Sequence, residues 1–142
     1  MMASANPTSI RLMERLGADT FNIPTDLTLA QIAAIRQAVD IPLDIYVEAP
    51  DDLGGFVRLY EIPELVRIAA PVYIKFGLRN APNIYPTGKH IESLAVALSR
   101  ERVRRARLGL DLLVRYYPDA VQSGPGGAGL AIPIVGPTPP LH

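Results

Sequence analysis

Apolar and polar residues alternate in three short segments of the chain, and this period of two predicts β-strands. In the most informative segment, residues 71–80, one alternate set is apolar, whereas the other set includes Lys75. Residues 19–23 and 41–48 repeat the pattern, again with polar residues opposite apolar ones. We therefore expect each strand to have one apolar face and one polar face.

Helical signals separate these strands. Asn6 followed by Pro7 is typical of a helix start, and Gly17 suits the left-handed residue that ends a helix. Thr28 and Gln31 have the spacing of a capping box at the start of the second helix. A short third helix is predicted over residues 64–70, directly before the third strand.

After the third strand, apolar residues at 91–98 and at 103–117 each fit one helical face, but the two faces are out of phase. The slip predicts two consecutive helices with a break near Ser99. Beyond residue 117 the sequence becomes rich in glycine and proline and loses its periodicity. We expect residues 118–142 to form a disordered or loosely draped tail.

Alternation of strands and helices predicts an α/β fold with a parallel sheet and right-handed crossovers. Central strands of an open doubly wound sheet are apolar on both faces, whereas these strands are polar on one face, which favours a barrel with a polar interior. Three strands are too few for a whole barrel of about 250 residues. We therefore interpret residues 1–117 as a partial, C-terminal half of a TIM-type barrel. Its open edges predict a homo-oligomer or a fragment of a longer chain.

Composition narrows the classes of function. The chain has 14 basic and 14 acidic residues and no cysteine, which argues against thiol chemistry, disulfides and metal–thiolate sites. It contains neither a signal-peptide pattern nor an apolar run of membrane-spanning length, so we expect a cytoplasmic protein without membrane contact. The basic cluster at 100–107 lacks interleaved aromatic residues, so we interpret it as a solvated helix face or subunit contact and predict no nucleic-acid partner. We also predict no cofactor.

Two stretches carry a family resemblance: GADTFNIPTDLTLAQIAAIRQAVDIPLDIYVE at 17–48 and DDLGGFVRLYEIPELVRIAAPVYIKFGLRNAPNIYP at 51–86. Within a match over about residues 8 to 117, the chain resembles the C-terminal part of the collagenase-like peptidases of family U-32. The resemblance implies a TIM-barrel fold and a hydrolase or peptidase activity. Members of that family often carry clustered cysteines, which this chain lacks, and the resemblance assigns no catalytic residue here.

Lys75 and Glu48 are the predicted catalytic residues, because both lie in the polar sets of neighbouring strands. A buried lysine beside a carboxylate can bind an anion or form a Schiff base, and Glu48 could serve as a general base. The alternative is a lysine–carboxylate pair that only satisfies a polar barrel interior.

Further residues are predicted to bind the substrate. Asn22 ends the first strand and could orient a carbonyl group. The loop after the third strand and the next helix start could bind an anionic group through positive side chains and free backbone N–H groups. The candidates there are Arg79, Asn80, Lys89 and His90.

Glu48, Asp51 and Asp52 place three carboxylates within five residues, as a divalent cation would require. Adjacent aspartates are also typical of turns, so we predict no metal site.

The leading hypothesis is a hydrolase-like barrel segment that binds a small molecule or peptide with an anionic group. One alternative is an aldolase-type lyase that forms an imine on Lys75. Another is a truncated barrel without catalytic activity that acts as an interaction module.

Overall fold

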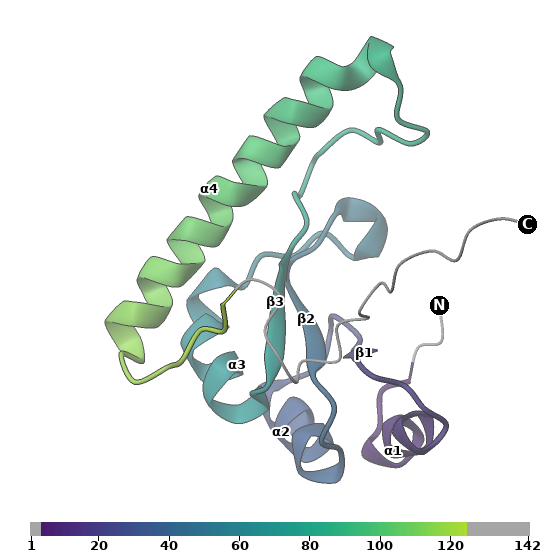
Figure 1. The fold of residues 1–142 in the computed structure, drawn as a ribbon, viewed down its shortest axis with the longest axis vertical. Coiled ribbons are helices and arrows are strands. Elements are labelled where there is room, and N and C mark those ends of the chain that lie inside the picture. Colours follow the sequence, from purple (N-terminus) through teal and green to yellow (C-terminus); the bar gives the residue numbers. More distant parts are fainter. Residues whose placement is uncertain (1–3, 125–142) are drawn as a thin grey trace, which may run out of the picture.

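The computed structural model describes residues 4–124 of the 142-residue chain. These residues form a mixed α/β fold with a parallel three-stranded sheet in the order β1-β2-β3 (Figure 1). The α/β class and the parallel strands are thus confirmed, whereas the partial barrel stays a prediction. The elements are α1 (Pro7–Arg15), β1 (Phe21–Asn22), α2 (Leu29–Ala38), β2 (Leu43–Glu48), α3 (Ile62–Ala69), β3 (Val72–Phe76) and α4 (Glu92–Tyr116), with short 3-10 turns at Asp51–Leu53, Leu59–Glu61 and Lys89–Ile91.

The ends of the first two helices follow from local side-chain chemistry. The Asn6 side chain accepts a hydrogen bond from the Ser9 N–H at 3.0 Å, which caps α1 behind a proline in its first turn. Gly17, after the end of α1, has a φ of 96°, a conformation that glycine adopts without steric cost. Thr28 and Gln31 form the predicted capping box at α2. These caps confirm the predicted helix starts.

The hydrophobic core lies between one face of the sheet and the helices. Leu43, Ile45 and Val47 of β2 are all at most 3% exposed, and Ile32 and Ile35 of α2 are completely buried. Burying one such side chain stabilises the fold by about 1.5–3 kcal/mol. The apolar alternate set of the strands therefore forms the core, as the sequence pattern predicts.

A register shift interrupts the pairing of β2 with β3. Tyr46 lies opposite Lys75, but Glu48 lies opposite Phe76, so one extra residue is accommodated on β2 between these two pairs. The Gly77 N–H donates to the Glu48 carbonyl at 2.8 Å immediately after the shift. The bulge places Glu48 on the same face as Phe76, where the helices pack.

Helix α4 is continuous over 25 residues, so the prediction of two helices with a break near Ser99 is wrong. The Ser99 hydroxyl donates to the Ala95 carbonyl at 2.8 Å, a bond that a serine forms within an unbroken helix. The slip in the apolar pattern instead follows from a change of surroundings along one helix. Gly109 is buried against the body of the protein, whereas the first half of α4 extends beyond the sheet (Figure 1).

The chain after α4 turns back toward the sheet, and residues 118–124 contain no helix or strand. Most of the predicted tail, residues 125–142, lies outside the described residues. Among helices of the described part, none combines the length and the apolar character needed to cross a bilayer.

Candidate functional site

The polar alternate residues of all three strands share the face of the sheet opposite the core. Strand register places Asn22 beside Asp44 and Asp44 beside Tyr73, which gives one row across the sheet. Tyr46 beside Lys75 forms the next row toward the carboxyl ends of the strands. The alternation in the sequence thus produces a polar sheet face, which is the candidate site.

Lys75 lies between an acidic and an aromatic side chain. Its Nζ is 3.9 Å from Asp44 Oδ2 and 4.7 Å from the centre of the Tyr46 ring. The ring face attracts the ammonium group, and the carboxylate opposes its charge. Because the Lys75 side chain is still 35% exposed, the ammonium can also be approached from solvent.

Asp44 has an altered acidity at this site. Burial raises the pKa of its carboxyl group above the usual value of 3.8, and the nearby Lys75 ammonium only partly opposes this shift. A carboxyl group that holds its proton more tightly is better suited to proton transfer near neutral pH. Asp44 is therefore the acid–base candidate of the polar face.

Asn22 contributes a buried hydrogen-bond acceptor to the same face. Its Oδ1 atom is buried and has no hydrogen-bond partner among the described residues. A buried polar atom without a partner is unfavourable, and a ligand N–H or O–H would satisfy it. Asn22 was predicted to orient a carbonyl group, whereas the unpartnered atom is an acceptor that would bind an N–H or O–H group, so its role in substrate binding stays a prediction.

The structure does not bring Glu48 to Lys75. Glu48 is 2% exposed, and its Oε2 atom lies 3.8 Å from Arg105 Nε of α4 on the helical side of the sheet. Its Oε1 atom accepts from the Arg79 backbone N–H at 3.3 Å. The bulge in β2 is the physical reason, because it reverses the face that Glu48 would otherwise occupy.

Asp44 is a candidate site residue that the sequence reasoning did not select. The available signal was its place in the same polar alternate set as Tyr46, on the strand next to Lys75. Glu48 belongs to the same alternate set in the sequence, which is why the pattern pairs it with Lys75.

Arg79 and Asn80 lie in the loop after β3 and are both bound to Asp51. Arg79 Nε donates to Asp51 Oδ1 at 3.3 Å, and the Asn80 N–H donates to Asp51 Oδ2 at 3.0 Å. Asp51 therefore already partly neutralises the positive charge of Arg79. Asp51 and Glu48 bind different partners, and no group of acidic or histidine side chains within residues 4–124 has an arrangement that could hold a metal ion.

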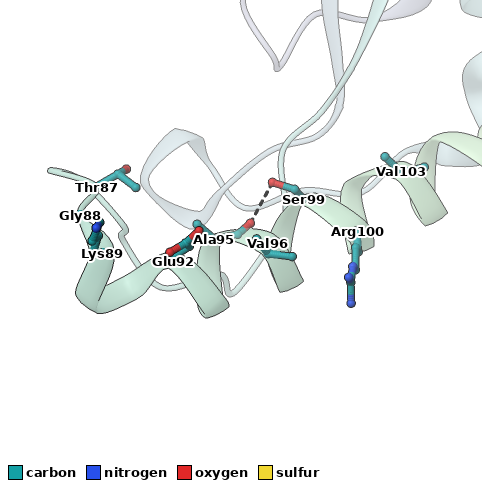
Figure 2. Close-up of a pocket in the computed structure, with 9 residues that line it drawn as sticks. All are labelled: Thr87, Gly88, Lys89, Glu92, Ala95, Val96, Ser99, Arg100 and Val103. Atoms are coloured by element: carbon teal, nitrogen blue, oxygen red, sulfur yellow. Dashed lines mark hydrogen bonds between the residues drawn. The ribbon is translucent and has the colours of Figure 1, made fainter.

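Lys89 and His90 lie in the turn that starts α4. Lys89 lines a groove of about 680 Å³ along the first half of this helix, together with Glu92, Val96 and Arg100 (Figure 2). Figure 2 shows the lining residues following one helix from its preceding turn to Val103. No described hydrogen bond or ion pair joins Lys89 or His90 to Arg79, so the four predicted anion-binding residues are not linked into one cluster by such contacts.

Comparisons with protein-family models, with curated proteins and with solved structures found no significant match to this chain.

Proposed function

We propose that the polar sheet face binds a small molecule or peptide through an anionic group and acts on it as a hydrolase-like site. The observation that carries the proposal is the position of the Lys75 ammonium between Asp44 and the Tyr46 ring, with one side open to solvent. The resemblance to the U-32 peptidases supports the class of reaction. Asp44 takes the role first considered for Glu48.

Lys75 is available to a ligand because its contact with Asp44 is not a close hydrogen bond. At 3.9 Å the two groups attract each other, yet the ammonium hydrogens stay free to donate to a carboxylate. An approaching anion would meet Lys75 from solvent, while a donor group of the same ligand meets Asn22 Oδ1. These two contacts would orient the ligand across β1, β2 and β3.

Asp44 would supply the proton transfers of a hydrolysis. As a carboxylate it accepts a proton from the attacking water, and as a carboxylic acid it returns a proton to the leaving group. Its raised pKa favours the second step. Further barrel strands, from a second copy or from a longer chain, would cover this face and exclude bulk water.

A second candidate is a lyase that forms an imine on Lys75. The nearby Asp44 favours it, because imine formation also needs an acid beside the amine. Both described contacts of Lys75 act on the charged ammonium, however, whereas imine formation needs the neutral amine. Borohydride reduction with a panel of keto acids tests this candidate, and an adduct on Lys75 would establish it over the anion-binding role.

The binding proposal is tested by NMR titration of the protein with a panel of small carboxylates and short peptides. The chain has only two lysines, so Lys89→Met is a matched control for Lys75→Met. Lys75→Met should lower affinity about 10-fold or more, since a hydrogen bond to a charged group contributes about 1.5–3 kcal/mol. Lys89→Met should leave affinity unchanged. Equal effects of both variants, or no binding by the unaltered protein, would reject the proposal.

A further inference from the structure

Strand β3 is an edge strand within the described residues, and its backbone has an identifiable unpaired side. The Leu43 N–H donates to the Pro71 carbonyl at 3.2 Å, and the Gly77 N–H donates to the Glu48 carbonyl at 2.8 Å. The backbone hydrogen-bonding groups of the odd-numbered residues from Pro71 to Gly77 therefore point to β2. The N–H and C=O groups of Val72, Ile74 and Phe76 point to the opposite edge.

An apolar groove follows that edge. It has a volume of about 630 Å³ and lies between β3 and the second half of α4, with Ile74, Phe76, Gly109 and Leu113 among its lining residues. Gly109 keeps the helix close to the sheet, because a Cβ atom there would lie 2.9 Å from the Phe76 ring. The groove is therefore bounded by an open strand edge on one side and a helix on the other.

The described chain ends beside this groove. Helix α4 runs opposite to β3 and returns the chain to the end of the sheet where β3 starts (Figure 1). Arg105 lies near the end of β2, while the Tyr116 carbonyl accepts from Arg67 of α3 at 3.4 Å. Val121 and Ser123 line the groove itself. The residues after 124 thus start from the position where a strand parallel to β3 would begin.

The following sequence has the composition of such a strand. Residues 125–129 are Pro-Gly-Gly-Ala-Gly, and residues 130–135 are Leu-Ala-Ile-Pro-Ile-Val. An apolar run of six residues spans about 20 Å, which exceeds the length of β3. Isoleucine and valine, which make up half of this run, are favoured in strands.

We propose that residues 130–135 dock into this groove as a fourth strand, parallel to β3 and paired with its open edge. The connection from β3 through α4 would then be the right-handed crossover that parallel strands require. The sequence analysis expects a disordered or draped tail for this segment, and the proposal is the alternative to that expectation. It is independent of the proposed function, because it rests on the strand edge, the groove, the position where the described chain ends and the sequence that follows, and not on the polar face.

Pro133 fixes the register of the proposed strand. Proline has no N–H to donate, so Pro133 must turn its backbone away from β3. The backbone groups of Leu130, Ile132 and Ile134 then pair with β3, and those of Ala131 point outward. In this register the N–H of residue 132 donates a hydrogen bond to β3, whereas the N–H of residue 131 does not. A proline at 132 therefore removes a donor to β3, and a proline at 131 removes none.

Hydrogen exchange of the β3 amides in the full chain tests the proposal. The amides of Ile74 and Phe76 should be protected, and ending the chain at Gly124 should speed their exchange about 100-fold. The amides of Tyr73 and Lys75 face β2, so they are internal controls that should stay protected. Rapid exchange at Ile74 and Phe76 in the full chain, beside protected controls, would overturn the proposal.

A proline pair in the full chain covers the case in which the shortened protein unfolds. Ile132→Pro should speed exchange at Ile74 and Phe76 about 100-fold, and Ala131→Pro should not. Any other pattern overturns the proposed strand. Light scattering on the same samples tests the alternative that a second copy of the chain fills the groove. Protection of Ile74 and Phe76 that appears only in a dimer would establish that alternative and overturn the proposal.

Discussion

The Lys75 ammonium and the Asp44 carboxylate face each other at 3.9 Å across two neighbouring parallel strands, with 35% and 20% of their side chains exposed. Burial acts more strongly on Asp44 than the lysine does, because the pKa of Asp44 is raised rather than lowered. The pair is therefore less favourable for folding than a surface ion pair would be.

Replacing Asp44 by asparagine should change how stability depends on pH. A raised pKa in the folded state means that the contribution of Asp44 to stability is complete below its unfolded pKa, near 3.8, and is lost as pH rises through the folded value. We therefore compare the melting temperature of Asp44→Asn with that of the unaltered protein at two pH values. The difference should favour the variant more at pH 7 than at pH 3.5. Thermal melts across this range measure the difference, and a constant difference would contradict the assigned shift.

Replacing Asn22 by alanine should separate stability from binding. The substitution removes a buried acceptor that has no partner in the described part of the chain, so stability should rise by up to about 1 kcal/mol. Affinity for the carboxylate ligand should fall about 10-fold. Asn83→Ala is the matched control, because Asn83 is exposed and its side chain only accepts from the Tyr85 N–H at 2.9 Å. Equal affinities of the two variants would exclude Asn22 from the site.

Arg105 should matter for stability because it opposes a buried charge. Arg105→Met leaves the Glu48 carboxylate without its closest cation and should cost about 1–3 kcal/mol, less than for a fully buried pair because Arg105 is 32% exposed. Adding Glu48→Gln should recover most of this loss.

Urea unfolding of the single and double variants measures this coupling. Arg104→Met is the control, because Arg104 is 58% exposed and pairs with Glu101, so its removal should change stability by less than about 0.5 kcal/mol. A similar loss at both arginines would show that the Glu48 contact is not the cause.

Gly109 should resist substitution although it lies inside a helix. An alanine Cβ would lie 2.7 Å from Ile62 Cδ1 and 2.9 Å from the Phe76 ring, which forces the helix or the ring to move. Overpacking of this kind costs about 1–3 kcal/mol, and the better helix propensity of alanine offsets about 1 kcal/mol of it. Val103→Ala, at a position 61% exposed on the same helix, should be neutral or stabilising. Stabilisation by Gly109→Ala in thermal melts would contradict the close packing.

Helix α4 should lose helicity in acid. Hydrogen bonds from Arg104, supported by Arg105, lower the pKa of Glu101 from 4.5 to about 2. The lowered value means that this contribution is present above pH 4.5 and is lost as pH falls toward 2. Circular dichroism should show a smaller acid loss for Glu101→Gln than for the unaltered protein. High salt should also reduce the difference, because these groups are in contact with solvent.

Local chemistry in the sequence was sufficient to predict the starts of α1 and α2 and the two faces of the strands up to the bulge before Glu48. Asn6, Gly17 and Thr28 act on neighbouring residues, so their effect can be derived without knowledge of the fold. Asn22 and Lys75 were placed on the polar face for the same reason, since alternation is a local property of a strand.

Features that depend on contacts between distant elements could not be predicted in this way. The bulge before Glu48 arises in the pairing of β2 with β3, and a shift of one residue exchanges the faces of the sheet. The continuity of α4 was missed because its two halves have different surroundings, which the apolar pattern records as a slip in phase. The pairing of Arg79 with Asp51 likewise depends on two loops that meet only in the folded chain.

The length of α4 has a mechanical consequence. Its 25 residues extend for about 37 Å, and the stretch from Glu92 to the close contact at Gly109 accounts for about 25 Å of this length. The helix could therefore tilt as a rigid body about the contact of Gly109 with Phe76. A tilt of about 10° about this contact would move the start of α4 at Glu92 by about 4 Å. A small rearrangement beneath Gly109 would thus be amplified at the turn that carries Lys89 and His90.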